Sequence, residues 1–151
     1  MIKKSTSLSS RLTLAFLLFS TVVFIFLNSL TSAAASAQSS GEIYSFLSRV
    51  LGFLPFFTHA FLRKAAHFAE FLLLGFLLGF FPPVFLRGKK REYLLPLLFG
   101  LLVAVIDELL QFFSPGRAPL FTDVLIDLCG VVVGLLLSLL LRYFFDKRRA
   151  L

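Results

Sequence analysis

The chain has 151 residues, of which 58% are hydrophobic and only 15% are charged, and its mean hydropathy is +0.93. Soluble domains carry about a quarter charged residues, so this composition excludes an ordinary soluble domain and predicts a single integral membrane domain over residues 1–151. The net charge of +7 does not indicate a nucleic-acid partner, because the basic residues flank apolar runs and have no stacking aromatics among polar residues.

The first apolar run, residues 12–30, is long enough to cross a bilayer, since a spanning helix needs about 20 residues. A basic start and the small-residue motif at Ala35–Ala37 are also typical of a cleavable signal peptide. The run exceeds the about 7–15 residues of a signal core, which favours a retained helix and leaves cleavage as the alternative. The Ser/Ala run at 31–40 is predicted to be a loop.

Residues 43–54 form a short amphipathic segment. Its apolar side chains recur at i, i+3, i+4, i+7, i+8 and i+11 on one helix face: Ile43, Phe46, Leu47, Val50, Leu51 and Leu54. The segment is too short and too one-sided to span, so we predict an interfacial helix on the outer membrane surface.

Three further apolar segments are predicted to span, at residues 61–86, 93–113 and 124–145. The stretch "SPGRAPLFT" separates the last two, because its two prolines and glycine do not continue a helix comfortably. The predicted fold class is therefore all-α. We expect an integral membrane four-helix bundle with a short amphipathic interfacial helix between helices 1 and 2.

The basic residues predict an orientation. Eleven of the 15 lysines and arginines fall in three flanks: Lys3, Lys4 and Arg11; Arg87, Lys89, Lys90 and Arg91; Arg142, Lys147, Arg148 and Arg149. Four passes place these flanks on one side, which the positive-inside rule assigns to the cytoplasm. We therefore predict a multi-pass protein with both termini cytoplasmic and "SPGRAPLFT" outside.

Polar side chains collect in the outer third of the second, third and fourth predicted spans. A charge at the bilayer centre costs about 2.5–3.5 kcal/mol, so such groups are paired, near an interface or functional. Helical spacing and the predicted topology bring them to a similar depth, where we expect one polar cluster: Lys64, His67, Glu70, Asp107, Glu108, Gln111, Arg117, Asp123 and Asp127.

Small residues continue the polar faces of the same helices. Gly75 with Gly79, and Gly130 with Gly134, form G-x-x-x-G motifs, which let membrane helices approach closely. The pattern predicts a tight bundle whose polar faces look inward.

The polar cluster admits several interpretations. In the first, Lys64 and Arg117 hold a phosphate or carboxylate, and the acids with Gln111 bind hydroxyl or amino groups of a headgroup. In a second, the protein is structural or binds a partner protein, and the charges only stabilise the bundle; Asp123 then also caps a helix. In a third, a divalent metal bound by the imidazole and carboxylates hydrolyses a lipid-linked substrate. An ion pathway is disfavoured, because the inner halves of the helices are nearly free of charge.

Three stretches of the chain, "FLNSLTSAAASAQSSG", "KAAHFAEFLLLGFLL" and "DELLQFFSPGRAPLFTDVLIDLCGVVVG", together resemble the VanZ-like family over residues 15–145. The residues that match the family pattern are Lys64, His67, Phe68, Glu70, Phe71, Asp107, Glu108, Gln111, Gly116, Arg117, Asp123, Asp127 and Gly130. The chain departs from it at Phe71, where the family commonly has a tyrosine, and in the less polar loop at Pro119 and Leu120.

The resemblance implies a four-helix protein of the bacterial cytoplasmic membrane that keeps its first helix, from a family linked to low-level resistance to teicoplanin. We expect it to bind or modify an envelope lipid or lipid-linked headgroup, with membrane lipids or a lipid-linked envelope precursor as partners. No cofactor is predicted apart from the divalent metal of the third interpretation. Whether catalysis occurs, and the oligomeric state, are not decided by the sequence.

Overall fold

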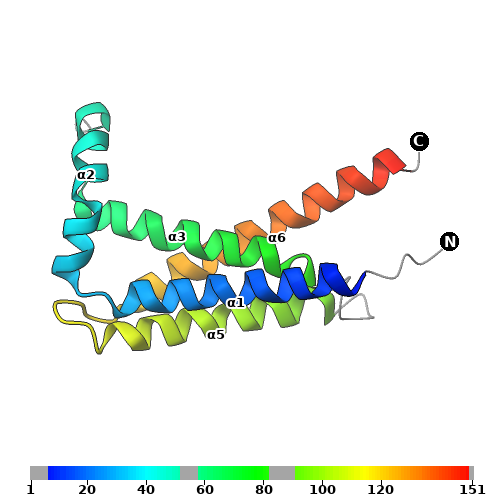
Figure 1. Cartoon of the computed structure of the whole chain (residues 1–151), viewed down its shortest axis with the longest axis horizontal. Coiled ribbons are helices and arrows are strands. Elements are labelled where there is room, and N and C mark those ends of the chain that lie inside the picture. The colour runs from blue at the N-terminus through cyan, green and yellow to red at the C-terminus, as the bar shows by residue number, and fades with distance from the viewer. Residues whose placement is uncertain (1–6, 52–57, 82–90, 150–151) are drawn as a thin grey trace.

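The computed structural model describes residues 7–51, 58–81 and 91–149. Within these residues the fold contains five helices and no strand: α1 Leu8–Leu30, α2 Ala33–Leu51, α3 His59–Leu78, α5 Arg91–Gln111 and α6 Phe121–Arg149. Helices α1, α3, α5 and α6 run along a common long direction, and α2 points away from them at one end (Figure 1). The predicted all-α class is confirmed.

Three helices are long and apolar enough to cross a membrane by length and composition: Leu8–Leu30, Tyr93–Gln111 and Phe121–Arg148. They correspond to the predicted first, third and fourth spans. The predicted second span corresponds to α3, which ends at Leu78 and carries Arg63, Lys64 and Glu70. Its predicted end, residues 82–86, lies outside the described residues, as do five of the residues behind the predicted orientation: Lys3, Lys4, Arg87, Lys89 and Lys90.

The prediction of a loop at residues 31–40 is wrong, because α2 begins at Ala33. Alanine has the highest helix propensity, and the hydroxyl of Ser32 accepts a hydrogen bond from the backbone N–H of Ala35 at 3.2 Å, as a residue at a helix start does. The serine and alanine residues at 32–35 therefore mark the start of α2 rather than a loop. The predicted amphipathic segment forms the second half of α2, where Phe46 and Val50 are exposed; its residues 52–54 lie outside the described part of the chain.

The packing of α3 on α6 is the most extensive contact between helices in the described structure. Glycines make this contact close: a Cβ added to Gly130 would lie 2.6 Å from the carbonyl oxygen of Phe68, and one added to Gly75 would lie 2.7 Å from Cα of Val131. Real Cβ atoms essentially never come so close. The predicted tight packing through small residues is confirmed for this helix pair.

The two ends of the bundle differ in what they hold. The start of α1 and the end of α6 lie toward one end, and α2 with the α5–α6 connection lies at the other (Figure 1). The connection is held to α2 by the backbone N–H of Ala33, which donates to the carbonyl of Pro115 at 3.1 Å. Gly116 in this connection has φ 77°, a left-handed conformation that glycine adopts without steric cost. The polar cluster lies toward this second end.

Candidate functional site

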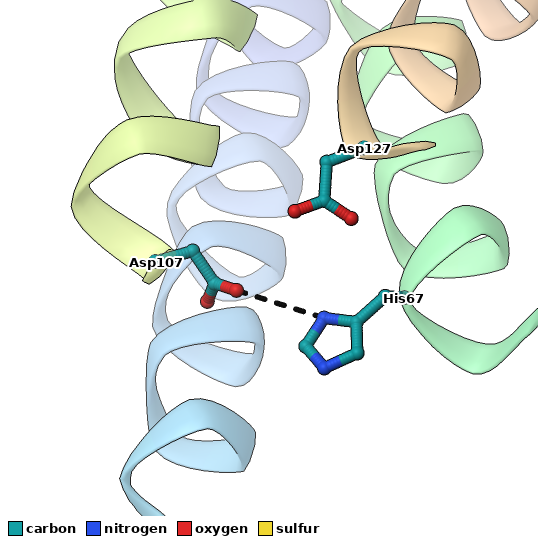
Figure 2. Close-up of side chains that lie close together, drawn as sticks. All are labelled: His67, Asp107 and Asp127. Atoms are coloured by element: carbon teal, nitrogen blue, oxygen red, sulfur yellow. Dashed lines mark ion pairs between the residues drawn. The ribbon is translucent and has the colours of Figure 1, made fainter. Parts of the chain in front are cut away.

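Three helices supply the centre of the polar cluster. His67 of α3, Asp107 of α5 and Asp127 of α6 point toward one another across the space between the helices (Figure 2). Each offers one ligand atom that lies within 4.8 Å of the other two. Nδ1 of His67 lies 3.6 Å from Oδ2 of Asp107, which is too long for a hydrogen bond.

Lys64 and Asp123 form an ion pair beside this centre, and Asp123 also accepts from the hydroxyl of Thr122 at 3.3 Å. Helix α6 begins at Phe121, three residues earlier than predicted, so Asp123 lies in its first turn rather than at the capping position before it. A carboxylate in a first turn interacts favourably with the helix dipole. The Asp123 carboxylate therefore joins α3 to α6 instead of capping.

The next acid, Glu108, fastens the α5–α6 connection. Its Oε1 accepts from the backbone N–H of Leu120 at 2.5 Å, and its Oε2 accepts from Nε2 of Gln111 at 2.9 Å. The same Nε2 lies 3.5 Å from Oδ2 of Asp107, at the limit of a hydrogen bond. Both oxygens of Glu108 are thus satisfied within the protein, and Glu108 with Gln111 forms the wall of the site on this side.

Helix α1 contributes two residues that the sequence-based prediction did not include in the cluster. Nδ2 of Asn28 donates to Oε1 of Glu70 at 2.7 Å, and the hydroxyl of Ser29 donates to Oδ1 of Asp107 at 2.6 Å. Ser114, in the α5–α6 connection, in turn donates to the carbonyl of Ser29 at 2.6 Å. An adjacent polar pair near the end of an apolar span was the available signal for Asn28 and Ser29.

Several buried atoms of the cluster have no hydrogen-bond partner among the described residues. They are Nδ1 of His67, Oε2 of Glu70, Nε and Nη1 of Arg117, and both carboxylate oxygens of Asp127. Leaving a buried polar group without a partner costs about 1–3 kcal/mol, and more for a charged one. The cluster therefore contains a cation and two acids whose bonding capacity the fold does not use.

Arg117 is the cation of this set that lies outside the helices, in the α5–α6 connection. Burial lowers the pKa of its guanidinium, and the nearby positive charge of Arg63 lowers this pKa further, while the acids Asp107 and Glu108 act in the opposite direction. An arginine stays protonated at neutral pH in proteins. The site therefore presents a partly desolvated guanidinium, which favours an anionic partner.

The structure brings all nine predicted residues to one end of the bundle, but it gives them different surroundings. Lys64, Asp123, Glu108 and Gln111 bond one another or the protein backbone. The remaining five surround or carry the unpartnered atoms: His67, Glu70, Asp107, Arg117 and Asp127. Chemically, this second set offers an imidazole, carboxylates and a guanidinium at one end of the bundle.

Comparison with known protein families gives a match to the model of the VanZ/LLP1 family over residues 14–142. The chain belongs to the VanZ/LLP1 family. The match covers most of the chain, including α2, α3 and α5, most of α1 and α6, and every residue of the polar cluster, and it confirms the resemblance stated from the sequence motifs. No curated protein and no solved structure matches the chain.

Proposed function

We propose that α3 crosses the membrane together with α1, α5 and α6, so that this VanZ/LLP1 protein is a four-span protein of the bacterial cytoplasmic membrane. Helix α3 has 20 residues, about the length that a bilayer requires. Its charged residues Arg63, Lys64 and Glu70 all lie in its first 12 positions, near one membrane surface. The start of α1 and the end of α6 lie at the same end of the bundle, which supports a topology with both on one side, and the basic flanks make that side the cytoplasm (Figure 1).

In this topology the polar cluster faces the outer leaflet, and we propose that it binds the headgroup of an envelope lipid or lipid-linked precursor. The observation that carries the proposal is that a cation and an acid of the cluster both have polar atoms without a hydrogen-bond partner within the described structure. Arg117 has two unpartnered nitrogens, and Asp127, with 1% of its surface exposed, has two unpartnered oxygens.

Headgroup chemistry matches both kinds of group. A phosphate or diphosphate accepts hydrogen bonds from two guanidinium nitrogens at once, which is the strongest common form of anion recognition by a side chain. Hydroxyl or amino groups of the same headgroup would donate to Asp127 and to Oε2 of Glu70. The acyl or prenyl chain of the ligand would stay in the bilayer, beside apolar helix surfaces such as Phe121 and Leu125 at the start of α6, which are 76% and 45% exposed.

A structural role is the second candidate, and a specific observation favours it. Side-chain contacts of the cluster join helices in pairs: Asn28 to Glu70, Ser29 to Asp107 and Lys64 to Asp123. Such contacts between membrane helices stabilise a bundle by about 0.6–2 kcal/mol each. None of these contacts uses Asp127 or the side chain of Arg117, so variants of those two residues separate the two functions.

The test of headgroup binding is a titration of the purified full-length protein in detergent micelles with a short-chain polyprenyl diphosphate. Parallel arms contain inorganic diphosphate or phosphatidylglycerol, which separate recognition of the whole lipid from recognition of its phosphates or of any anionic lipid. Native mass spectrometry measures the bound fraction. The variants are Arg117→Gln and, on the exposed face of α5, Leu109→Ala as a matched control.

We expect wild type and Leu109→Ala to bind the polyprenyl diphosphate equally. Loss of a charge-assisted contact worth about 1.5–3 kcal/mol should weaken binding by Arg117→Gln by about 10- to 100-fold. Equal affinity of all three proteins, or no binding by wild type, would contradict the proposal. A lower melting temperature of Arg117→Gln with unchanged affinity would favour the structural role.

Teicoplanin tolerance provides the cellular readout that family membership suggests. In a sensitive Gram-positive host, we expect wild type and Leu109→Ala to raise tolerance, and Arg117→Ala and Asp107→Asn to fail at equal membrane abundance. If wild type leaves tolerance unchanged, this phenotype is not a property of the protein.

A further inference from the structure

We propose that His67, Asp107 and Asp127 bind one divalent transition-metal ion, with zinc as the best-fitting member of the class. This inference concerns the centre of the polar cluster and does not rest on headgroup binding. It stands on the geometry of three side chains, on the burial of one of them and on their donor chemistry.

The first argument is the geometry of the three ligand atoms. They come from three different helices and lie within 4.8 Å of one another (Figure 2). Tetrahedral zinc with ligand bonds near 2.1 Å holds its ligand atoms about 3.4 Å apart. The 3.6 Å between Nδ1 of His67 and Oδ2 of Asp107 is close to that separation and longer than a hydrogen bond. Small side-chain rotations of Asp127 would complete the set.

The second argument is the environment of Asp127. Its residue surface is 1% exposed, and neither carboxylate oxygen has a hydrogen-bond partner among the described residues. The carboxylate is directed into the space that His67 and Asp107 also face (Figure 2). Lys64, the lysine of the cluster, is engaged by Asp123 instead. Buried charges in proteins are paired or coordinate metals, and a metal ion would give Asp127 the partner that the protein does not supply.

The third argument is the donor set. One imidazole and two carboxylates are ligands that zinc accepts, and three protein ligands leave a position for water or a substrate oxygen. Two carboxylates and a neutral imidazole carry a charge of −2, which a divalent ion balances. Imidazole favours zinc and related transition ions over magnesium or calcium, which prefer oxygen ligands alone.

The surroundings of Asp107 resemble the supporting contacts of known metal ligands. Its Oδ1 accepts from Ser29 at 2.6 Å, while Oδ2 faces His67. Hydrogen bonds of this kind fix the orientation of a ligating carboxylate, and their loss costs about 10- to 100-fold in metal affinity. Ser29 therefore has a positioning role in the proposed site.

The test uses the full-length protein in detergent micelles, stripped with a chelator, re-equilibrated with Zn²⁺ and freed of excess metal. Elemental analysis measures bound zinc, and isothermal titration calorimetry with Zn²⁺ alone measures affinity. The variants are Asp127→Asn and His67→Gln, which change a ligand with little change in volume. The matched control is Asp123→Asn, an acid of the same helix that is bound by Lys64 and lies outside the trio.

We expect about one zinc per chain for wild type and for Asp123→Asn, as for a single three-ligand site. Asp127→Asn and His67→Gln should each lose most of the bound metal while remaining monodisperse. Cobalt added in place of zinc should give the intense visible absorption of a tetrahedral site in wild type and Asp123→Asn, and not in the two ligand variants. If one of the two variants does not fold, the other carries the test.

The inference is overturned if wild type retains less than about 0.1 zinc per chain, or if the ligand variants retain as much as wild type. The lipid titration described above, repeated with EDTA present, separates the two proposals. Diphosphate binding that persists in EDTA, in a protein that retains no zinc, would contradict the metal site and support the headgroup site. Zinc binding by a protein that binds no lipid would contradict the headgroup site and support the metal site.

Discussion

The two ends of this helical bundle are built from the same four helices but hold opposite contents. The end that holds α2 and the α5–α6 connection (Figure 1) is the outer end of the proposed topology, and it buries most acids of the polar cluster, including Asp107 and Asp127, which are 0% and 1% exposed. The opposite end, the inner end of the proposed topology, has an open cavity of about 650 Å³ between α1, α3 and α5, lined by apolar side chains such as Leu18, Val22, Leu78 and Leu102. None of the lining residues is charged.

This difference shows which end of the bundle departs from purely apolar packing between the helices. Apolar side chains line the inner end, where a buried charge would have no partner. At the outer end the fold buries charged groups and leaves part of their bonding capacity unused. Proteins break such packing rules mainly at functional sites, so the comparison supports placing the function at the outer end.

The most direct test of this difference is to place an acidic residue, of the kind found at the outer end, among the apolar side chains of the inner end. We expect Leu78→Asp, at a residue 3% exposed, to destabilise the protein by about 3 kcal/mol or more, because it buries an unpaired charge, and to reduce its membrane abundance. Leu78→Met is the volume-matched control and should cost less than about 1.5 kcal/mol. Thermal unfolding of both variants measures the effect. Wild-type stability of Leu78→Asp would mean that the two ends do not differ in their tolerance of charge.

The contact between α3 and α6 extends along the bundle between its two ends, and the glycines in this contact give a second prediction. We expect Gly134→Val to cost about 2–3 kcal/mol, because its Cβ would collide with the backbone of Leu72 and Phe76. Gly41→Val is the control, since nothing lies within 4 Å of the Cβ position there. Melting temperatures in one detergent compare the variants. Equal losses for both would show that close packing of α3 on α6 is not what holds the bundle.

A smaller effect is expected from the link between α1 and the outer end. Ser29→Ala removes the hydrogen bond to Asp107, so it should destabilise the protein by about 1.5 kcal/mol and also weaken zinc binding. Thr31→Ala, whose hydroxyl bonds only the backbone of its own helix at Leu27, is the control. Thermal unfolding and zinc calorimetry on both proteins measure the two effects. If Ser29→Ala keeps wild-type stability and metal affinity, α1 does not contribute to the site through Ser29.

The smallest effect concerns the ion pair that sits nearest to solvent. The side chain of Lys64 is 34% exposed, so its pair with Asp123 should contribute no more than about 1 kcal/mol and should weaken as salt is added. Unfolding of Lys64→Gln at low and high ionic strength measures this. If Lys64→Gln instead lowers the free energy of unfolding by several kcal/mol at both ionic strengths, this ion pair is a main source of the protein's stability.

The sequence predicted the parts of this account that depend on local pattern. Apolar length and flanking charge identified the long helices, and helical spacing with alternating topology brought distant residues such as His67 and Asp127 to one depth. Spacing could not predict which atoms pair, because that depends on side-chain direction. Glu108, rotated away from the face of Asp107, turns out to hold the backbone of Leu120.

Other features needed the packed structure. Asn28 and Ser29 are neutral residues near the end of a span, where polar residues are ordinary, and only the position of α1 against α3 and α5 reveals their partners. Helix α2 was partly predicted as a loop, because serine and alanine occur in loops as well as at helix starts. The inner cavity depends on how large side chains fit together, which periodicity does not report.

The most direct test of the central claim is the melting temperature of wild type and Arg117→Gln, each with and without the polyprenyl diphosphate. If Arg117 serves a ligand, replacing its unsatisfied charge should leave the melting temperature of the free protein unchanged or raise it, as removal of a functional group that destabilises the fold does. The increase that the diphosphate produces in wild type should be lost. A variant that melts several degrees lower on its own, yet is stabilised by the diphosphate as much as wild type, would contradict the account and make the outer polar cluster a structural clamp.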